Sequence, residues 1–103
     1  MKNNELIKIY INGNKEAGTV NHIGFIKNDF YNYSTLICTI DRENKTAQFN
    51  NRKYSHTTGK IQNNLKYELN QAGYIIEEYE GPEAIPWNYG YQGAPTLKAA
   101  GMF

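Results

Sequence analysis

The amino-terminal part of the chain has the alternating pattern of short strands. In residues 6–11, isoleucines recur at every second position before the polar stop Asn12-Gly13-Asn14. A period of two followed by such a triplet is typical of a half-buried strand and a turn. Residues 20–30 are also apolar, but Gly24 interrupts them and their period is mixed. We therefore predict a strand over residues 6–11 and a bulged strand over residues 20–30.

The clearest hairpin lies in the middle of the chain. Residues 33–40 are rich in β-branched side chains and apolar on both faces, which is typical of a central strand covered on each side. Residues 41–45 are polar and predict a turn, and residues 46–49 predict a short partner strand.

After Tyr54 the period changes to that of an amphipathic helix. Apolar residues recur at steps of four, four and three, at Ile61, Leu65, Leu69 and Ala72. Ser55, Thr57 or Thr58 can cap the first turn, and Gly73 can end the helix in the left-handed conformation. Residues 74–79 then predict one more strand.

Together these elements predict an α+β fold in the order β-β-β-β-α-β. We expect a mostly antiparallel sheet of about five strands with one helix on one face, formed by a core domain of residues 1–80. Residues 81–103 differ in composition, since they hold all three prolines and the only tryptophan. They predict an irregular aromatic tail.

The tail carries a candidate partner-binding surface. Trp87, Tyr89 and Tyr91 recur with a period of two, so an extended segment places their rings on one side. Such rings are typical anchors of interfaces. Alternatively, the tail folds back over the sheet and packs on the core.

Charge is unevenly distributed along the chain. The net charge of +1 provides no overall field for an anionic partner. However, residues 42–66 contain six basic side chains and one acid, whereas residues 68–83 contain five acids and no base. The single cysteine, Cys38, excludes an internal disulfide and suits a reducing compartment. No apolar run is long enough to span a membrane, so we expect a cytoplasmic protein.

The basic region near the predicted helix start is a candidate phosphate or nucleic-acid site. Its residues are Arg52, Lys53, Thr57, Thr58, Lys60 and Lys66. First-turn amides of a helix bind phosphate well, and nearby cations strengthen such binding. In the alternative reading, the threonines only cap the helix. A nucleotide P-loop is excluded, because Ile61 follows Gly59-Lys60 where a hydroxyl is needed.

No residues suggest catalysis or metal binding. Cys38 lies in the most apolar strand, which indicates a buried structural thiol. His22 and His56 lack the spacing of metal ligands. The glutamates near the predicted last strand alternate between its faces and predict a solvated acidic edge. We therefore predict a protein that is not an enzyme and has no cofactor or metal.

Two segments carry a resemblance to a known family. Residues 54–63 (Tyr-Ser-His-Thr-Thr-Gly-Lys-Ile-Gln-Asn) and residues 30–37 (Phe-Tyr-Asn-Tyr-Ser-Thr-Leu-Ile) resemble small uncharacterised proteins of phages and prophages. Those proteins pair an aromatic-rich strand with a Tyr-Ser-x-Thr-Thr-Ser-Lys-His helix start. The resemblance covers about residues 30–65, and it departs at Ile61, where histidine often stands. It implies a source rather than an activity.

The leading functional hypothesis is therefore a phage or prophage accessory protein that acts by binding in the host cytoplasm. Its expected partner is a host protein that it inhibits or redirects, such as a CRISPR-type defence nuclease. The alternative is a nucleic-acid-binding module that uses the basic region. An enzyme acting on small phosphorylated substrates ranks last, and the sequence leaves the oligomeric state open.

Overall fold

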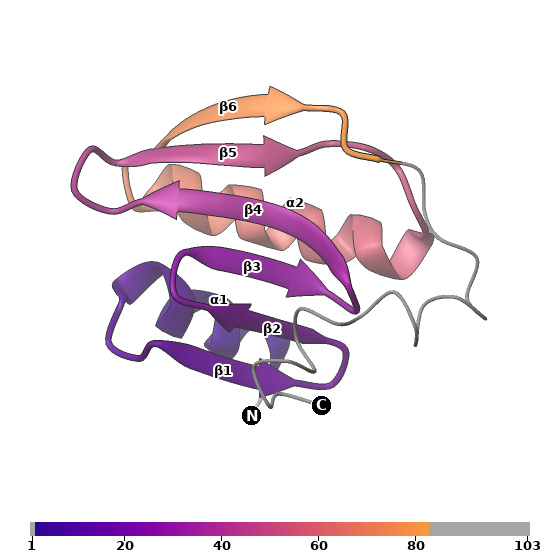
Figure 1. The fold of residues 1–103 in the computed structure, drawn as a ribbon, viewed down its shortest axis with the longest axis horizontal. Coiled ribbons are helices and arrows are strands. Elements are labelled where there is room, and N and C mark those ends of the chain that lie inside the picture. The colour runs from indigo at the N-terminus through magenta and orange to yellow at the C-terminus, as the bar shows by residue number, and fades with distance from the viewer. Residues whose placement is uncertain (1, 83–103) are drawn as a thin grey trace.

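The computed structural model describes residues 2–82 as a six-stranded sheet with two helices (Figure 1). Of the predicted tail, only Gly81 and Pro82 fall within the described residues, and Trp87, Tyr89 and Tyr91 lie outside them. In chain order the elements are α1 (Asn3–Asn12), β1 (Ala17–Val20), β2 (Ile23–Ile26), β3 (Asp29–Asn32), β4 (Thr35–Asp41), β5 (Thr46–Asn50), α2 (His56–Gln71) and β6 (Ile75–Tyr79). The predicted α+β class is confirmed.

The strands follow one another across the sheet in sequence order. Neighbouring strands from β1 to β5 are antiparallel, and β6 pairs with β5 in parallel. Both helices lie behind the sheet in Figure 1, α1 behind its β1 and β2 end and α2 behind the β4 to β6 part. Because β5 and β6 are parallel, their carboxyl ends lie at the same end of the sheet, beside the start of α2.

The prediction of a single helix is wrong, because residues 6–11 belong to α1 and not to a strand. The helix buries Leu6, Ile7, Tyr10 and Ile11. These residues follow the spacing i, i+1, i+4, i+5, which forms one helical face. Ile7, Ile9 and Ile11 also fit the strand period of two, because a window of six residues is too short to distinguish it from the helical period of about 3.6.

The prediction of one bulged strand over residues 20–30 is wrong: this segment contains β2, a hairpin turn on each side of it, and the adjoining ends of β1 and β3. Asn21 and Lys27 adopt left-handed backbone angles, each with φ of 53°, and they lie in the turns on either side of β2. A bulge does occur, but between β3 and β4. Phe30 pairs with Cys38 and Tyr31 pairs with Leu36, so Ile37 has no partner residue.

The bulge explains the doubly apolar pattern of residues 33–40. Ile37 and Cys38 are neighbours, and both are fully buried. A bulge places two successive residues of one strand opposite one residue of its partner, which allows this. The predicted cover on both faces is not seen among residues 2–82, where both helices lie on one face.

The predicted start and end of α2 are confirmed. Ser55 is the N-cap, and its Oγ accepts a hydrogen bond from the Thr58 amide at 3.1 Å. Gly73 follows the helix with φ of 82°, a conformation that glycine adopts without steric cost.

The core is built around the ring of Tyr10. Its centroid lies 5.4 Å from that of Phe25 and 5.1 Å from that of Phe30. The buried hydroxyl donates to the carbonyl oxygen of Asn28 at 2.7 Å and reaches that of Cys38 at 3.4 Å. Tyr10 thereby fixes α1 to β2, β3 and β4 and to the turn between β2 and β3.

The thiol of Cys38 should react only when the fold opens. Cys38 has no exposed surface, and burial raises its pKa to about 12. At pH 8 the folded protein therefore keeps the thiol protonated, which is the unreactive form. We expect a chromogenic disulfide reagent to label it in guanidinium but not in native buffer.

Asn64→Cys provides the positive control for this labelling, because Asn64 is exposed on α2 and its new thiol should react at once. Rapid labelling of Cys38 in the folded wild-type protein would contradict its burial.

Candidate binding cleft

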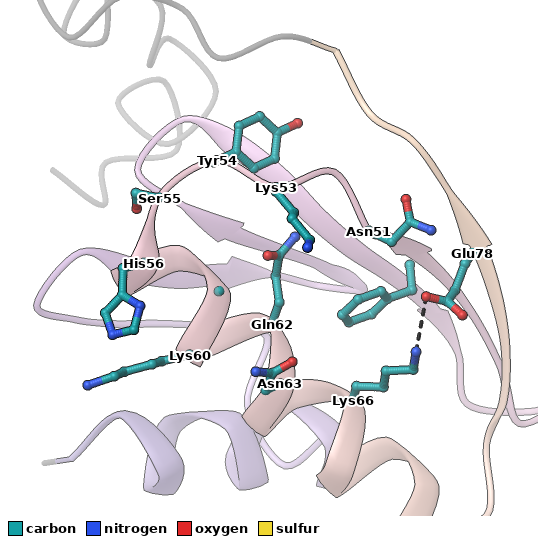
Figure 2. A pocket seen from close by; sticks show the side chains of 12 residues that line it. Asn51, Lys53, Tyr54, Ser55, His56, Lys60, Gln62, Asn63, Lys66 and Glu78 are labelled. Atoms are coloured by element: carbon teal, nitrogen blue, oxygen red, sulfur yellow. Dashed lines mark hydrogen bonds and ion pairs between the residues drawn. The ribbon is translucent and has the colours of Figure 1, made fainter.

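A cleft of about 540 Å³ lies between the start of α2 and the ends of β5 and β6 (Figure 2). Its lining comes from Phe49 of β5, the loop of residues 51–55, the first three turns of α2 and Glu78 of β6. Segments far apart in the sequence thus meet at one edge of the sheet.

Three lysines bring positive charge to this cleft. Lys53 comes from the loop, and Lys60 and Lys66 come from α2. Lys66 donates to Glu78 Oε1 at 3.0 Å, and its Nζ lies 5.9 Å from the centroid of the Phe49 ring. Lys53 and Lys60 are exposed. Among residues 2–82, Glu78 is the one carboxylate in the lining, so the described cleft favours anions.

His56 and Tyr54 add polar and aromatic surface to the cleft. His56 is the first residue of α2 and is exposed, and Tyr54 is half-buried. Figure 2 shows both side chains at the end of the cleft where the loop enters the helix, at some distance from the Lys66–Glu78 pair.

The loop between β5 and α2 is held in place by the side chain of Asn50, which has no exposed surface. Its Nδ2 donates to the Leu36 carbonyl oxygen at 3.0 Å and to Tyr54 Oη at 2.9 Å. Its Oδ1 accepts from the amides of Arg52 at 3.0 Å and Gly81 at 2.9 Å. These four bonds use the whole hydrogen-bonding capacity of the amide group.

Gln62 fixes α2 to the same loop. Its Nε2 donates to the carbonyl oxygens of Asn50 at 2.8 Å and Arg52 at 3.0 Å. Gly81 packs so closely on Asn50 that an added Cβ would lie 2.3 Å from Asn50 Nδ2. The cleft walls are therefore set before any ligand arrives.

The six residues predicted for the basic site separate into two groups. Lys53, Lys60 and Lys66 line the cleft, whereas Arg52, Thr57 and Thr58 do not. Arg52 Nη1 donates to the Gly81 carbonyl oxygen at 3.0 Å and lies 3.5 Å from Glu80 Oε1.

The two threonines differ in exposure. Thr58 is buried, and its Oγ1 accepts hydrogen bonds from Ser55 Oγ at 3.0 Å and from Asn32 Nδ2 at 2.5 Å. It serves the helix cap and the contact with β3. Thr57 is exposed beside the cleft.

Sequence reasoning did not identify Asn50, Gln62 and Tyr54 as organisers of the site. A usable signal was present for Gln62, because it stands three residues before Leu65 and seven before Leu69 and so shares their face of the helix. Asn50 gave no such signal, since an asparagine after a strand is usually read as a turn residue.

Among residues 2–82, no group of three or more histidine, cysteine, aspartate or glutamate side chains is placed to hold a metal ion. Within the same range, neither helix is long and apolar enough to cross a membrane. The cleft itself offers ammonium, imidazole, amide and phenol groups, which suit the binding of phosphate oxygens.

Comparison of the chain with protein-family models, curated proteins and solved structures found no match. The resemblance to phage proteins therefore stays a prediction that rests on residues 30–65.

Replacing Asn50 should weaken the whole fold, because its loss leaves buried polar groups of three segments without partners. We expect Asn50→Ala to lower the free energy of unfolding by about 2–4 kcal/mol. Urea denaturation followed by circular dichroism measures this change.

Gln48→Ala is the matched control, since Gln48 lies on the same strand but is exposed and bonds only to Glu77. It should change the free energy of unfolding by less than about 1 kcal/mol. Equal effects of the two substitutions would show that Asn50 does not organise the site.

Proposed function

We propose that this protein binds nucleic acid through the phosphates, using the lysine cleft at the start of α2. The proposal rests on one observation: Lys53, Lys60 and Lys66 all line one preorganised cleft, and among residues 2–82 that lining includes a single carboxylate. Phosphate contacts supply most of the non-specific affinity of nucleic-acid-binding proteins.

The arrangement of the lysines favours a chain of phosphates over one small phosphorylated substrate. Lys60 and Lys66 are six residues apart on α2, which separates their backbones by about 9 Å along the helix axis. Lys53 comes from the loop, across the cleft from α2 (Figure 2). Cations spread in this way can each meet a different phosphate of a polymer.

The binding should be modest in strength and sensitive to salt. The chain as a whole has a net charge of +1, so only local contacts attract the ligand. On binding, Lys66 exchanges its bond with Glu78 for a bond with a phosphate. About three neutralised phosphates on a single strand then predict that log affinity falls with log salt concentration with a slope of about −2.

Titration of a labelled oligothymidine at several salt concentrations tests this proposal. Fluorescence anisotropy should give a slope of log affinity against log salt concentration of about −2 for the wild type. Each Lys→Gln change in the cleft should make this slope less steep by about 0.7. Lys53→Gln/Lys60→Gln/Lys66→Gln should abolish most binding.

Lys8→Gln/Lys15→Gln/Lys27→Gln is the matched control, because it removes the same charge from exposed lysines outside this cleft. If both triple variants bind alike, the cleft is not the site. If the wild type binds no oligonucleotide at low salt, the proposed function is wrong.

We propose host-protein binding as the second candidate, favoured by the place where the tail begins. Gly81 is held by Asn50, and the Pro82 carbonyl oxygen accepts a hydrogen bond from Tyr54 Oη at 2.7 Å. Tyr54 also lines the cleft. The segment that carries the predicted aromatic anchors thus starts beside the cleft. A phage accessory protein of this kind would engage a host defence nuclease with the cleft and with those anchors together.

This second candidate predicts capture and inhibition of a nuclease in the host cytoplasm. Affinity purification from host lysate should recover a nuclease, and Trp87→Ala/Tyr89→Ala/Tyr91→Ala should lose at least about tenfold in affinity for it, as loss of interface anchors does. Unchanged capture by that variant would contradict a role for the tail.

A further inference from the structure

A second surface lies at the same end of the sheet as the cleft. The β1–β2 and β3–β4 turns meet there, and they bring His22 and Tyr33 together. The two rings are stacked, with centroids 4.6 Å apart and planes inclined by 15°. Both side chains are exposed, Tyr33 by 54%. One face of each ring lies against the other, and the rest of the pair exposes aromatic surface to solvent.

The backbone of the turns holds this pair in place. The amide of Tyr33 donates to the carbonyl oxygen of His22 at 2.7 Å. Tyr33 itself has φ of 55°, in the left-handed region that glycine or asparagine occupies more readily. Turn geometry alone does not call for a tyrosine at this position, and the exposed ring adds nothing to the core.

The segment that carries Tyr33 is linked to the start of α2 through the side chain of Asn32. Asn32, next to Tyr33, donates to Thr58 Oγ1, and Thr58 is followed by Gly59 of the cleft lining. Figure 1 shows both turns and the first residue of α2 at the same end of the sheet. The aromatic surface and the lysine cleft thus flank one helix start.

We propose that the His22–Tyr33 pair is a stacking platform for unpaired bases, so that the ligand of the cleft is single-stranded. This inference rests on the proposed function. Exposed aromatic rings stack on bases of any identity, and a strand whose bases are free can place them on the rings while its phosphates meet lysines. Bases inside a duplex are already stacked and are not available to such a platform.

Tyr33→Asn provides a direct test, because asparagine accepts the left-handed backbone of this turn and removes only the ring. Affinity for oligothymidine should fall by about 5- to 150-fold, the effect of losing one stacked base. The salt slope and the weaker affinity for a duplex should not change, because the phosphate contacts remain. Tyr33→Phe should keep the wild-type affinity.

Tyr67→Gln is the control for loss of an exposed tyrosine, since Tyr67 is 60% exposed on α2 and lies outside the cleft lining. It should bind like the wild type, and unchanged thermal midpoints would show that both variants fold. If Tyr33→Asn binds oligothymidine as tightly as the wild type does, the platform is wrong while the cleft stands. If the wild type binds no oligonucleotide, both proposals fall.

Discussion

The arrangement of the cleft depends on the hydrogen bonds of the buried Asn50 side chain. Its amide joins β4, the loop before α2 and the residues that follow β6. The orientation of the amide is set by its partners, because a backbone carbonyl can only accept and two backbone amides can only donate. Removing this one side chain would leave Gly81 and the loop without their common support.

The pairing of β5 with β6 gives this amide its role. The carboxyl ends of parallel strands lie at the same end of a sheet. The polar residues that follow β5 and β6 therefore lie close to the first turn of α2. The apolar contacts of Tyr10 stabilise the opposite part of the molecule, around α1. The hydrogen bonds of Asn50 stabilise the part around the start of α2, where the polar residues of the cleft are gathered.

Local patterns in the sequence predicted α2, its caps and the β4–β5 hairpin, because these depend on residues close together in the chain. The apolar segment in α1 was too short to distinguish the helical period from the strand period. The bulge at Ile37 could not be predicted without knowing how β3 pairs with β4. The three cleft lysines were predicted as part of a basic region. Their separation from Arg52 and Thr58 depends on buried hydrogen bonds that link distant segments, and local patterns contain no such information.

The proposed function places phosphate binding at one preorganised cleft of a protein whose net charge is only +1. Amide chemical-shift mapping with single-stranded DNA tests this most directly. The largest shifts should fall on residues 51–66, with a second group around His22 and Tyr33. Shifts confined to other parts of the sheet, or no shifts at low salt, would contradict it.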